Sequence, residues 1–139
     1  MIVGDGPQRE LLERGCSGKA FVRFVGQQTG STLRQIYASA QAFAFASRVD
    51  TLGLVNMEAM ASGLPVLVPS DSCIAELVEH GVSAYCYLPG VAGLAAGIGH
   101  LLDNTAAARR LSEAGRQVMI ARWNETSFSR IWDSLIGRA

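Results

Sequence analysis

The stretch SRVDTLGLVNMEAMASGLP, residues 47–65, decides the fold of this chain. It follows an apolar run, residues 42–46, that is typical of a buried strand, and a helix is predicted from about Leu54 onward. Asp50 lies in the loop before the helix, and Glu58 lies one turn inside the helix, eight positions after Asp50. In open α/β sheets such loops lie at the carboxyl ends of the strands, where ligands bind. Two carboxylates and the unpaired N–H groups of a helix start therefore face one small volume, which suits a ligand with hydroxyls and phosphates.

The same spacing also fits a purely structural role for both acids. Asp50 can cap the helix by accepting a hydrogen bond from its first N–H groups, and Glu58 can be a solvated residue on the helix surface. The spacing by itself favours neither interpretation. A ligand site and a capped helix therefore both stay open at this point.

Short β-rich runs alternate with helical patterns along the whole chain, which is typical of an α/β protein with parallel strands. The predicted strands are residues 1–3, 20–25, 42–46, 65–68 and 84–87. One predicted helix ends near residue 14, and a second contains residues 33–37. Further helices are predicted over residues 54–62, 74–79, 91–102, 106–122 and 127–136. The pattern predicts a Rossmann-like, three-layer αβα domain with a mostly parallel sheet. We expect one domain over residues 1–139, with C-terminal helices at about residues 91–136.

Composition and charge exclude several classes of protein. Twelve basic residues balance twelve acidic ones, so no basic surface for nucleic acid is expected. No apolar run reaches the ~18–20 residues that a membrane span needs. Three cysteines form no CxxC pair and the two histidines are distant, so we expect reduced thiols and no metal site. The default prediction is a cytoplasmic protein.

A family resemblance rests on the motif Asp50-x7-Glu58 and on the residues around it, Gly53-Leu54-Val55 and Glu58-Ala59-Met60-Ala61-Ser62-Gly63-x-Pro65. The motif is similar to the signature of glycosyltransferase family 4 (group 1), retaining enzymes of the GT-B fold. Four further motifs agree in order and spacing: Val3-Gly4-Asp5-Gly6-Pro7, Val22-x-Phe24-Val25-Gly26, Tyr37-x-x-Ala40 and Glu76-Leu77-Val78-x-x-Gly81. The resemblance covers nearly the whole chain and implies the C-terminal domain that binds the nucleotide-sugar donor.

The resemblance assigns a role to each residue of the site. Asp50 contacts hydroxyls of the donor sugar, and Glu58 binds the ribose hydroxyls of a UDP- or GDP-type donor. Backbone amides of Leu52, Gly53 and Leu54 approach the sugar and the diphosphate. The base lies against the main chain of Val25 and Gly26. Arg48 contacts phosphate or sugar, or else forms a salt bridge with Asp50 or Glu58.

Two departures from the family pattern concern the site. Asp50 replaces a glutamate and so shortens the reach of the side chain by one methylene. Ser72 and Cys73 stand where the family often has two glycines, and this removes backbone freedom for close approach to the donor.

Another departure concerns the extent of the chain. The family's donor domain begins with a strand and a basic loop for the diphosphate, and an N-terminal acceptor-binding domain precedes it; we expect this chain to lack all three. The sheet then closes by pairing residues 1–3 with 42–46, or by borrowing a strand in a homodimer.

These implications give two functional hypotheses. In the first, the chain is the donor-binding domain of a retaining glycosyltransferase that moves a sugar from a nucleotide diphosphate to an acceptor hydroxyl. The isolated chain is then inactive, and the intact enzyme is cytoplasmic or peripheral at the inner face of the membrane. In the second, the chain is a truncated, non-catalytic module without useful nucleotide binding. A GT-B epimerase or phosphorylase, or a receiver-like or flavodoxin-like domain, fits less of the pattern. The sequence leaves the donor sugar, the base and the acceptor open.

Overall fold

The computed structural model of the chain describes residues 1–50 and 53–123. The chain divides into two compact units, Met1–Ile36 and Tyr37–Ala139. The predicted helix over residues 127–136 lies outside the described residues. A single domain over residues 1–139 stays a prediction.

The first unit contains helix α1 (Arg9–Gly15), most of helix α2 (Gly30–Ser39) and one isolated strand pair. Ile2 forms a parallel bridge with Phe24, and the N–H of Ile2 donates to the carbonyl of Arg23 at 2.7 Å. The predicted strand over residues 20–25 is therefore reduced to this bridge. The N–H of Val25 donates to the carbonyl of Ile2 at 3.1 Å, which completes the bridge.

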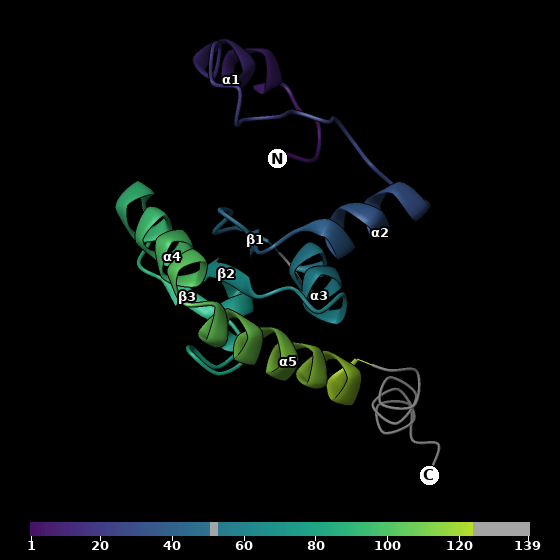
Figure 1. Cartoon of the computed structure of the whole chain (residues 1–139), viewed down its shortest axis with the longest axis vertical. Coiled ribbons are helices and arrows are strands. Elements are labelled where there is room, and N and C mark those ends of the chain that lie inside the picture. The colour runs from purple at the N-terminus through teal and green to yellow at the C-terminus, as the bar shows by residue number, and fades with distance from the viewer. Residues whose placement is uncertain (51–52, 124–139) are drawn as a thin grey trace. The chain divides into compact units, whose positions relative to one another are not determined.

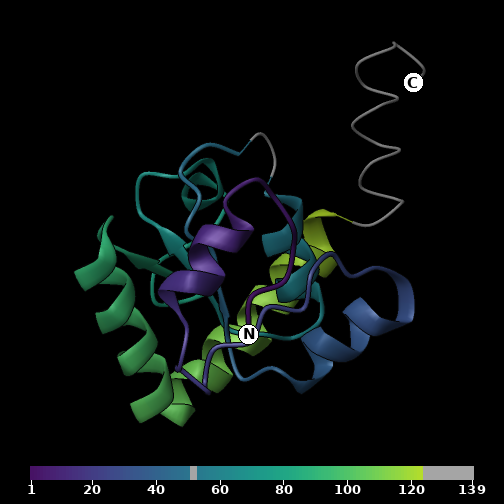
Figure 2. The same ribbon diagram turned by 90° about the horizontal axis from the view of Figure 1, so that it is seen from above.

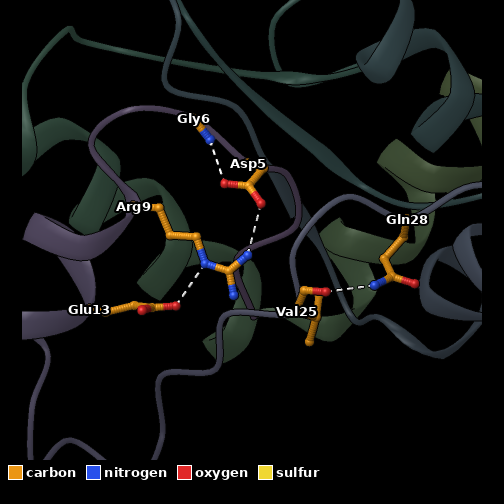
Figure 3. A network of polar contacts seen from close by, with 6 residues as sticks. All are labelled: Asp5, Gly6, Arg9, Glu13, Val25 and Gln28. Atoms are coloured by element: carbon orange, nitrogen blue, oxygen red, sulfur yellow. Dashed lines mark hydrogen bonds and ion pairs between the residues drawn. The ribbon is translucent and has the colours of Figure 1, made fainter.

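A polar network ties α1 to the turn that precedes it (Figure 3). The Arg9 guanidinium donates from Nε to Glu13 Oε1 at 2.8 Å and from Nη1 to Asp5 Oδ2 at 3.0 Å. Asp5 Oδ1 accepts from the N–H of Gly6 at 2.8 Å. The Gly6 N–H, and after it Arg9, hold the pKa of Asp5 below its usual value. All of these groups are solvent-accessible, so the network orients the turn more than it stabilises the fold.

Three parallel strands form the sheet of the second unit, in the order β1-β2-β3 (Figure 1). They are β1 (Phe43–Ala44), β2 (Val66–Pro69) and β3 (Tyr85–Tyr87). Phe43 pairs with Val66 in β2, and Leu67 pairs with Tyr85 in β3. Every residue of β2 is buried, as expected for the central strand of a parallel sheet. The predicted parallel α/β architecture is confirmed.

Strand β1 differs from its prediction in length and in burial. The apolar run over residues 42–46 predicts a strand covered on both faces, whereas β1 has two residues and Ala44 is exposed. The ladder continues only through the N–H of Phe45, which donates to the carbonyl of Leu67 at 3.0 Å. Because β1 is an outer strand of the three-stranded sheet, its apolar residues are covered less than those of β2.

The helices of the second unit lie on both sides of the sheet. The last residues of helix α2 (Gly30–Ser39) belong to the second unit. They are followed by α3 (Leu54–Ala61), α4 (Val91–Asp103) and α5 (Thr105–Arg122). Figures 1 and 2 show α3 and α4 on opposite sides of β2, and α5 packs against both helices. The predicted helix over residues 74–79 is instead a single 3₁₀ turn, η1 (Cys73–Glu76), the form that such short helical pieces often take.

One buried cluster of the core lies between the sheet and helices α4 and α5. It consists of Leu67, Tyr87, Leu101 and Leu111. Gly97 in α4 brings that helix close to the sheet, since a Cβ atom there would stand 2.8 Å from Leu67 Cδ2. This packing holds β2 in place, and through β2 it positions the end of β1, where the acidic loop begins.

Candidate functional site

Asp50 is anchored at both its side chain and its backbone. Its carboxylate Oδ1 accepts a hydrogen bond from the N–H of Gly53 at 3.0 Å, immediately before α3. Its carbonyl oxygen lies 2.7 Å from Cys73 Sγ, and the thiol donates this bond from the start of η1. The side chain of Asp50 is half-buried. The acid is therefore held at the N-terminal end of α3 by two neighbouring segments.

Gly53 forms the start of α3 in a conformation that favours glycine. Its φ of 64° and ψ of 36° lie in the left-handed region. A Cβ atom at this position would stand 3.3 Å from the side chain of Ile74 and 3.3 Å from Asn56 Nδ2. Leu54, the first residue of the helix, is 59% exposed, so this end of α3 is open to solvent. The first N–H groups of a helix have no partner within the helix, and they favour an anion.

Glu58 lies one turn further along α3 and is fixed by a tyrosine. Its side chain is exposed, but Oε2 accepts a hydrogen bond from the Tyr37 hydroxyl at 3.1 Å. The same hydroxyl lies 3.4 Å from the carbonyl of Val55, a much weaker contact. Tyr37 itself is 8% exposed, and burial, followed by the Glu58 carboxylate, raises its pKa to about 12. Tyr37 therefore restricts the rotation of a carboxylate that is otherwise free to sample water.

Arg48 forms an ion pair with Asp71, in the loop after β2. The sequence interpretation named Asp50 or Glu58 as the salt-bridge partner of Arg48, and it did not indicate Asp71. The side chain of Arg48 is 66% exposed, so the pair contributes little to stability.

Val25 and Gly26, predicted to lie against the base, belong to the first unit. The carbonyl of Val25 accepts from Gln28 Nε2 at 2.6 Å, and the carbonyl of Gly26 accepts from the N–H of Gly4 at 2.8 Å (Figure 3 shows the first bond). Gly26 has a φ of 68°, and a Cβ atom there would stand 3.1 Å from the Arg9 guanidinium. This main chain is therefore held by its own neighbours. Leu52, the remaining predicted backbone contact, lies outside the described residues.

Several residues that shape the site were not identified from the sequence. Tyr37 stood in a quoted motif, but its bond to Glu58 joins two helices that no local pattern connects. Asn56 is the least expected. It is 0% exposed, and both polar atoms of its amide lack a hydrogen-bond partner among the described residues. A polar residue among the apolar positions of a short helix is the signal that was available for it.

Residues 1–50 and 53–123 contain no group of three or more His, Cys, Asp or Glu side chains that is arranged to hold a metal ion. Over these residues no helix combines the length and the apolar character needed to cross a membrane.

Comparison with known proteins gives concordant results. The profile of the family described as Glycosyl transferases group 1 matches residues 1–118. A sulfoquinovosyl transferase of Arabidopsis thaliana is 39% identical over 92 residues, which are 64% of this chain and 18% of that protein. A GDP-mannose-dependent alpha-(1-6)-phosphatidylinositol monomannoside mannosyltransferase of Mycobacterium tuberculosis is 29% identical over 150 residues, covering 99% of this chain and 37% of that protein.

A solved structure shares the fold over nearly the whole chain. The Anabaena HepE protein, crystallised with UDP-glucose, superposes with a TM-score of 0.84 at 25% identity, covering 97% of this chain and 40% of that one. The chain thus spans less than half the length of these relatives.

Proposed function

The chain belongs to the group 1 glycosyl transferases, and from this premise we propose that it binds the nucleotide-sugar donor of a retaining, family 4-like enzyme. The observation that carries the proposal is the anchoring of two carboxylates around the start of α3. Asp50 is held there by Gly53 and Cys73, and Glu58 is held by Tyr37. Carboxylates fixed in this way present acceptors to hydroxyl groups without losing further side-chain freedom on binding.

Each part of the donor has a chemically suitable partner. We assign the donor-sugar hydroxyls to Asp50 and the ribose hydroxyls to Glu58, because an ionised carboxylate accepts hydrogen bonds from vicinal diols. The diphosphate is assigned to the N–H groups of Leu52, Gly53 and Leu54 at the helix start. Arg48, which is exposed beside this loop, is a further candidate for the diphosphate. The base is assigned to the main chain of Val25 and Gly26.

The protein's contribution to the reaction is positioning and charge stabilisation. In our proposal the sugar passes from the nucleotide diphosphate to an acceptor hydroxyl that enters on the face from which the nucleotide leaves, so the anomeric configuration is retained. The departing diphosphate helps to accept the proton of that hydroxyl. No covalent nucleophile is invoked, and the rate enhancement rests on orientation and on groups that stabilise the developing negative charge.

The acceptor and the complete reaction require more than this chain. The relatives are roughly 2.7 to 3.7 times as long as this chain, and we propose that an acceptor-binding domain completes the site. The 139 residues alone are then expected to lack transferase activity while retaining weak donor binding, in the reducing conditions of the cytoplasm. The second candidate is a non-catalytic module that pairs through β1, whose Ala44 is exposed on an outer strand.

The ribose assignment is tested by combining a protein variant with a ligand variant. NMR titration of the chain with UDP and with its 2′,3′-dideoxy analogue measures the dissociation constants for wild type and Glu58→Ala. Loss of hydrogen bonds to a charged group weakens UDP binding by about tenfold or more. The dideoxy analogue should bind both proteins equally. Glu113→Ala, which removes an exposed glutamate of α5, is the matched control.

The outcomes separate the two candidates. If Glu58→Ala binds UDP as tightly as wild type does, the ribose assignment is wrong. If wild type binds neither UDP nor GDP, and sedimentation at several concentrations gives a stable dimer, the non-catalytic module is favoured.

A further inference from the structure

Asn56 has a buried amide without a partner. It lies in the first turn of α3, it is 0% exposed, and neither Oδ1 nor Nδ2 makes a hydrogen bond to the described residues. Burying an unpaired amide is unfavourable for folding, and an apolar side chain of similar shape carries no such cost. For stability alone, a leucine or valine would therefore be expected at position 56 of this apolar helix. The residue is nevertheless an asparagine.

The amide is directed toward the N-terminal end of α3. Nδ2 stands 3.3 Å from the point where a Cβ atom of Gly53 would be, so it lies directly against the residue that starts the helix. This direction agrees with the general tilt of helical side chains toward the N-terminus. The NH2 group is the positive end of the amide dipole. It is therefore next to the helix end where the unpaired N–H groups also converge.

The same helix end already carries a negative charge. Asp50 Oδ1 accepts from the N–H of Gly53 at 3.0 Å, so its carboxylate occupies one donor of the turn. A phosphate that binds there meets the field of that carboxylate as well as the field of the helix dipole. A further positive dipole end, fixed in a buried position, offsets part of this repulsion.

We propose that Asn56 is a positioning residue for phosphate, whose fixed amide dipole strengthens anion binding at the N-terminal end of α3. The inference rests on the proposed function, because it assumes that the diphosphate of the donor occupies this helix end. Asn56 does not touch the ligand. It acts through the electrostatic field at the first turn of α3. In the ligand-free protein its buried amide lowers the free energy of unfolding, and when phosphate binds the same amide stabilises the complex.

The test compares a phosphorylated and an unphosphorylated ligand. Asn56→Leu keeps the branching at Cγ and removes the dipole, and Asn56→Ala keeps the binding measurement available if leucine overfills the site. NMR titrations of the full chain give the affinities for UDP, inorganic pyrophosphate and uridine. Denaturation midpoints verify that each variant is folded. Met60→Leu, another buried position of α3 with no polar atom, is the control.

We expect Asn56→Leu and Asn56→Ala to weaken UDP and pyrophosphate by about twofold to fivefold, the range of helix-end charge effects, and to leave uridine unchanged. Equal losses for UDP and uridine would overturn the inference, because they indicate a packing defect. Unchanged UDP binding would overturn it as well. If the wild-type chain binds UDP and the variants give either of these two results, the inference is wrong and the proposed function is retained. A wild-type chain that binds neither UDP nor pyrophosphate overturns the proposed function and the inference together.

Discussion

The substitution Tyr37→Phe removes a single hydroxyl that links α2 to the Glu58 carboxylate. The hydroxyl donates to Glu58 Oε2 at 3.1 Å, and the ring of Tyr37 packs against Phe43 with centroids 6.0 Å apart. Phenylalanine keeps the ring contact. Because Glu58 is exposed, water replaces the lost donor. The expected loss in free energy of unfolding near neutral pH is therefore about 1 kcal/mol, the usual net value of one hydrogen bond.

The pH dependence gives a sharper expectation than the loss itself. In the folded chain the pKa of Tyr37 is raised to about 12, chiefly by burial and next by Glu58. An unfolded tyrosine releases its proton near pH 10, so between about pH 10 and pH 12 the unfolded chain binds fewer protons than the folded chain, and stability falls as pH rises. At pH 11 this linkage removes about 1.4 kcal/mol from wild type and nothing from Tyr37→Phe.

The stability difference between the two proteins should therefore change sign. Wild type is expected to be the more stable by about 1 kcal/mol at pH 8, and slightly the less stable at pH 11. Urea denaturation of both proteins at several pH values measures the difference, and every other titrating group cancels between them. A difference that stays constant from pH 8 to pH 11 would refute the reasoning, because it would mean that the Tyr37 phenol titrates alike in both states.

Two further substitutions test the packing and the loop. Gly115→Ala should lower the free energy of unfolding by about 1–2 kcal/mol, because its Cβ atom would stand 2.7 Å from the backbone oxygen of Ser83. The control is Gly99→Ala, which has open space around its Cβ atom and should gain up to about 1 kcal/mol from helix propensity. Denaturation midpoints measure both changes. Equal shifts for both glycines would contradict the packing argument. Arg48→Ala should change stability by less than about 1 kcal/mol, since its pair with Asp71 is exposed, and it should weaken UDP binding if the guanidinium contacts the diphosphate. Unchanged UDP affinity would remove Arg48 from the site.

The fold was predictable where burial was uniform along a segment. The run that became β2 and the helical repeats of α4 and α5 lie in the core, so their apolar pattern records their surroundings directly. The prediction of a strand over residues 20–25 was wrong in its extent. Residues 20–25 carry the composition of a strand, yet Phe21 is 82% exposed and only Phe24 is paired. Composition describes the side chains, whereas a strand also needs a neighbour of equal length.

The site was predictable in its charges and not in their partners. The spacing of Asp50 and Glu58 identified both acids, because the helix between them fixes the geometry locally. Tyr37, Asp71 and Cys73 reach these residues or Arg48 from other segments, and such contacts depend on tertiary packing that no local period encodes. The purely structural interpretation agrees with two observations, since Asp50 accepts from the helix start and Glu58 is exposed, but it did not include the bond from Tyr37 to Glu58.

The position of β2 has a consequence for the order of assembly. Each of its ladders joins segments roughly 20 residues apart, so neither forms until loops of that length have closed. The helices α4 and α5, by contrast, are contiguous and form through local contacts. The acidic loop follows β1, which joins the sheet only by pairing with β2. We therefore expect the two carboxylates to come into position with these long-range pairings, and not with the local contacts that form the helices.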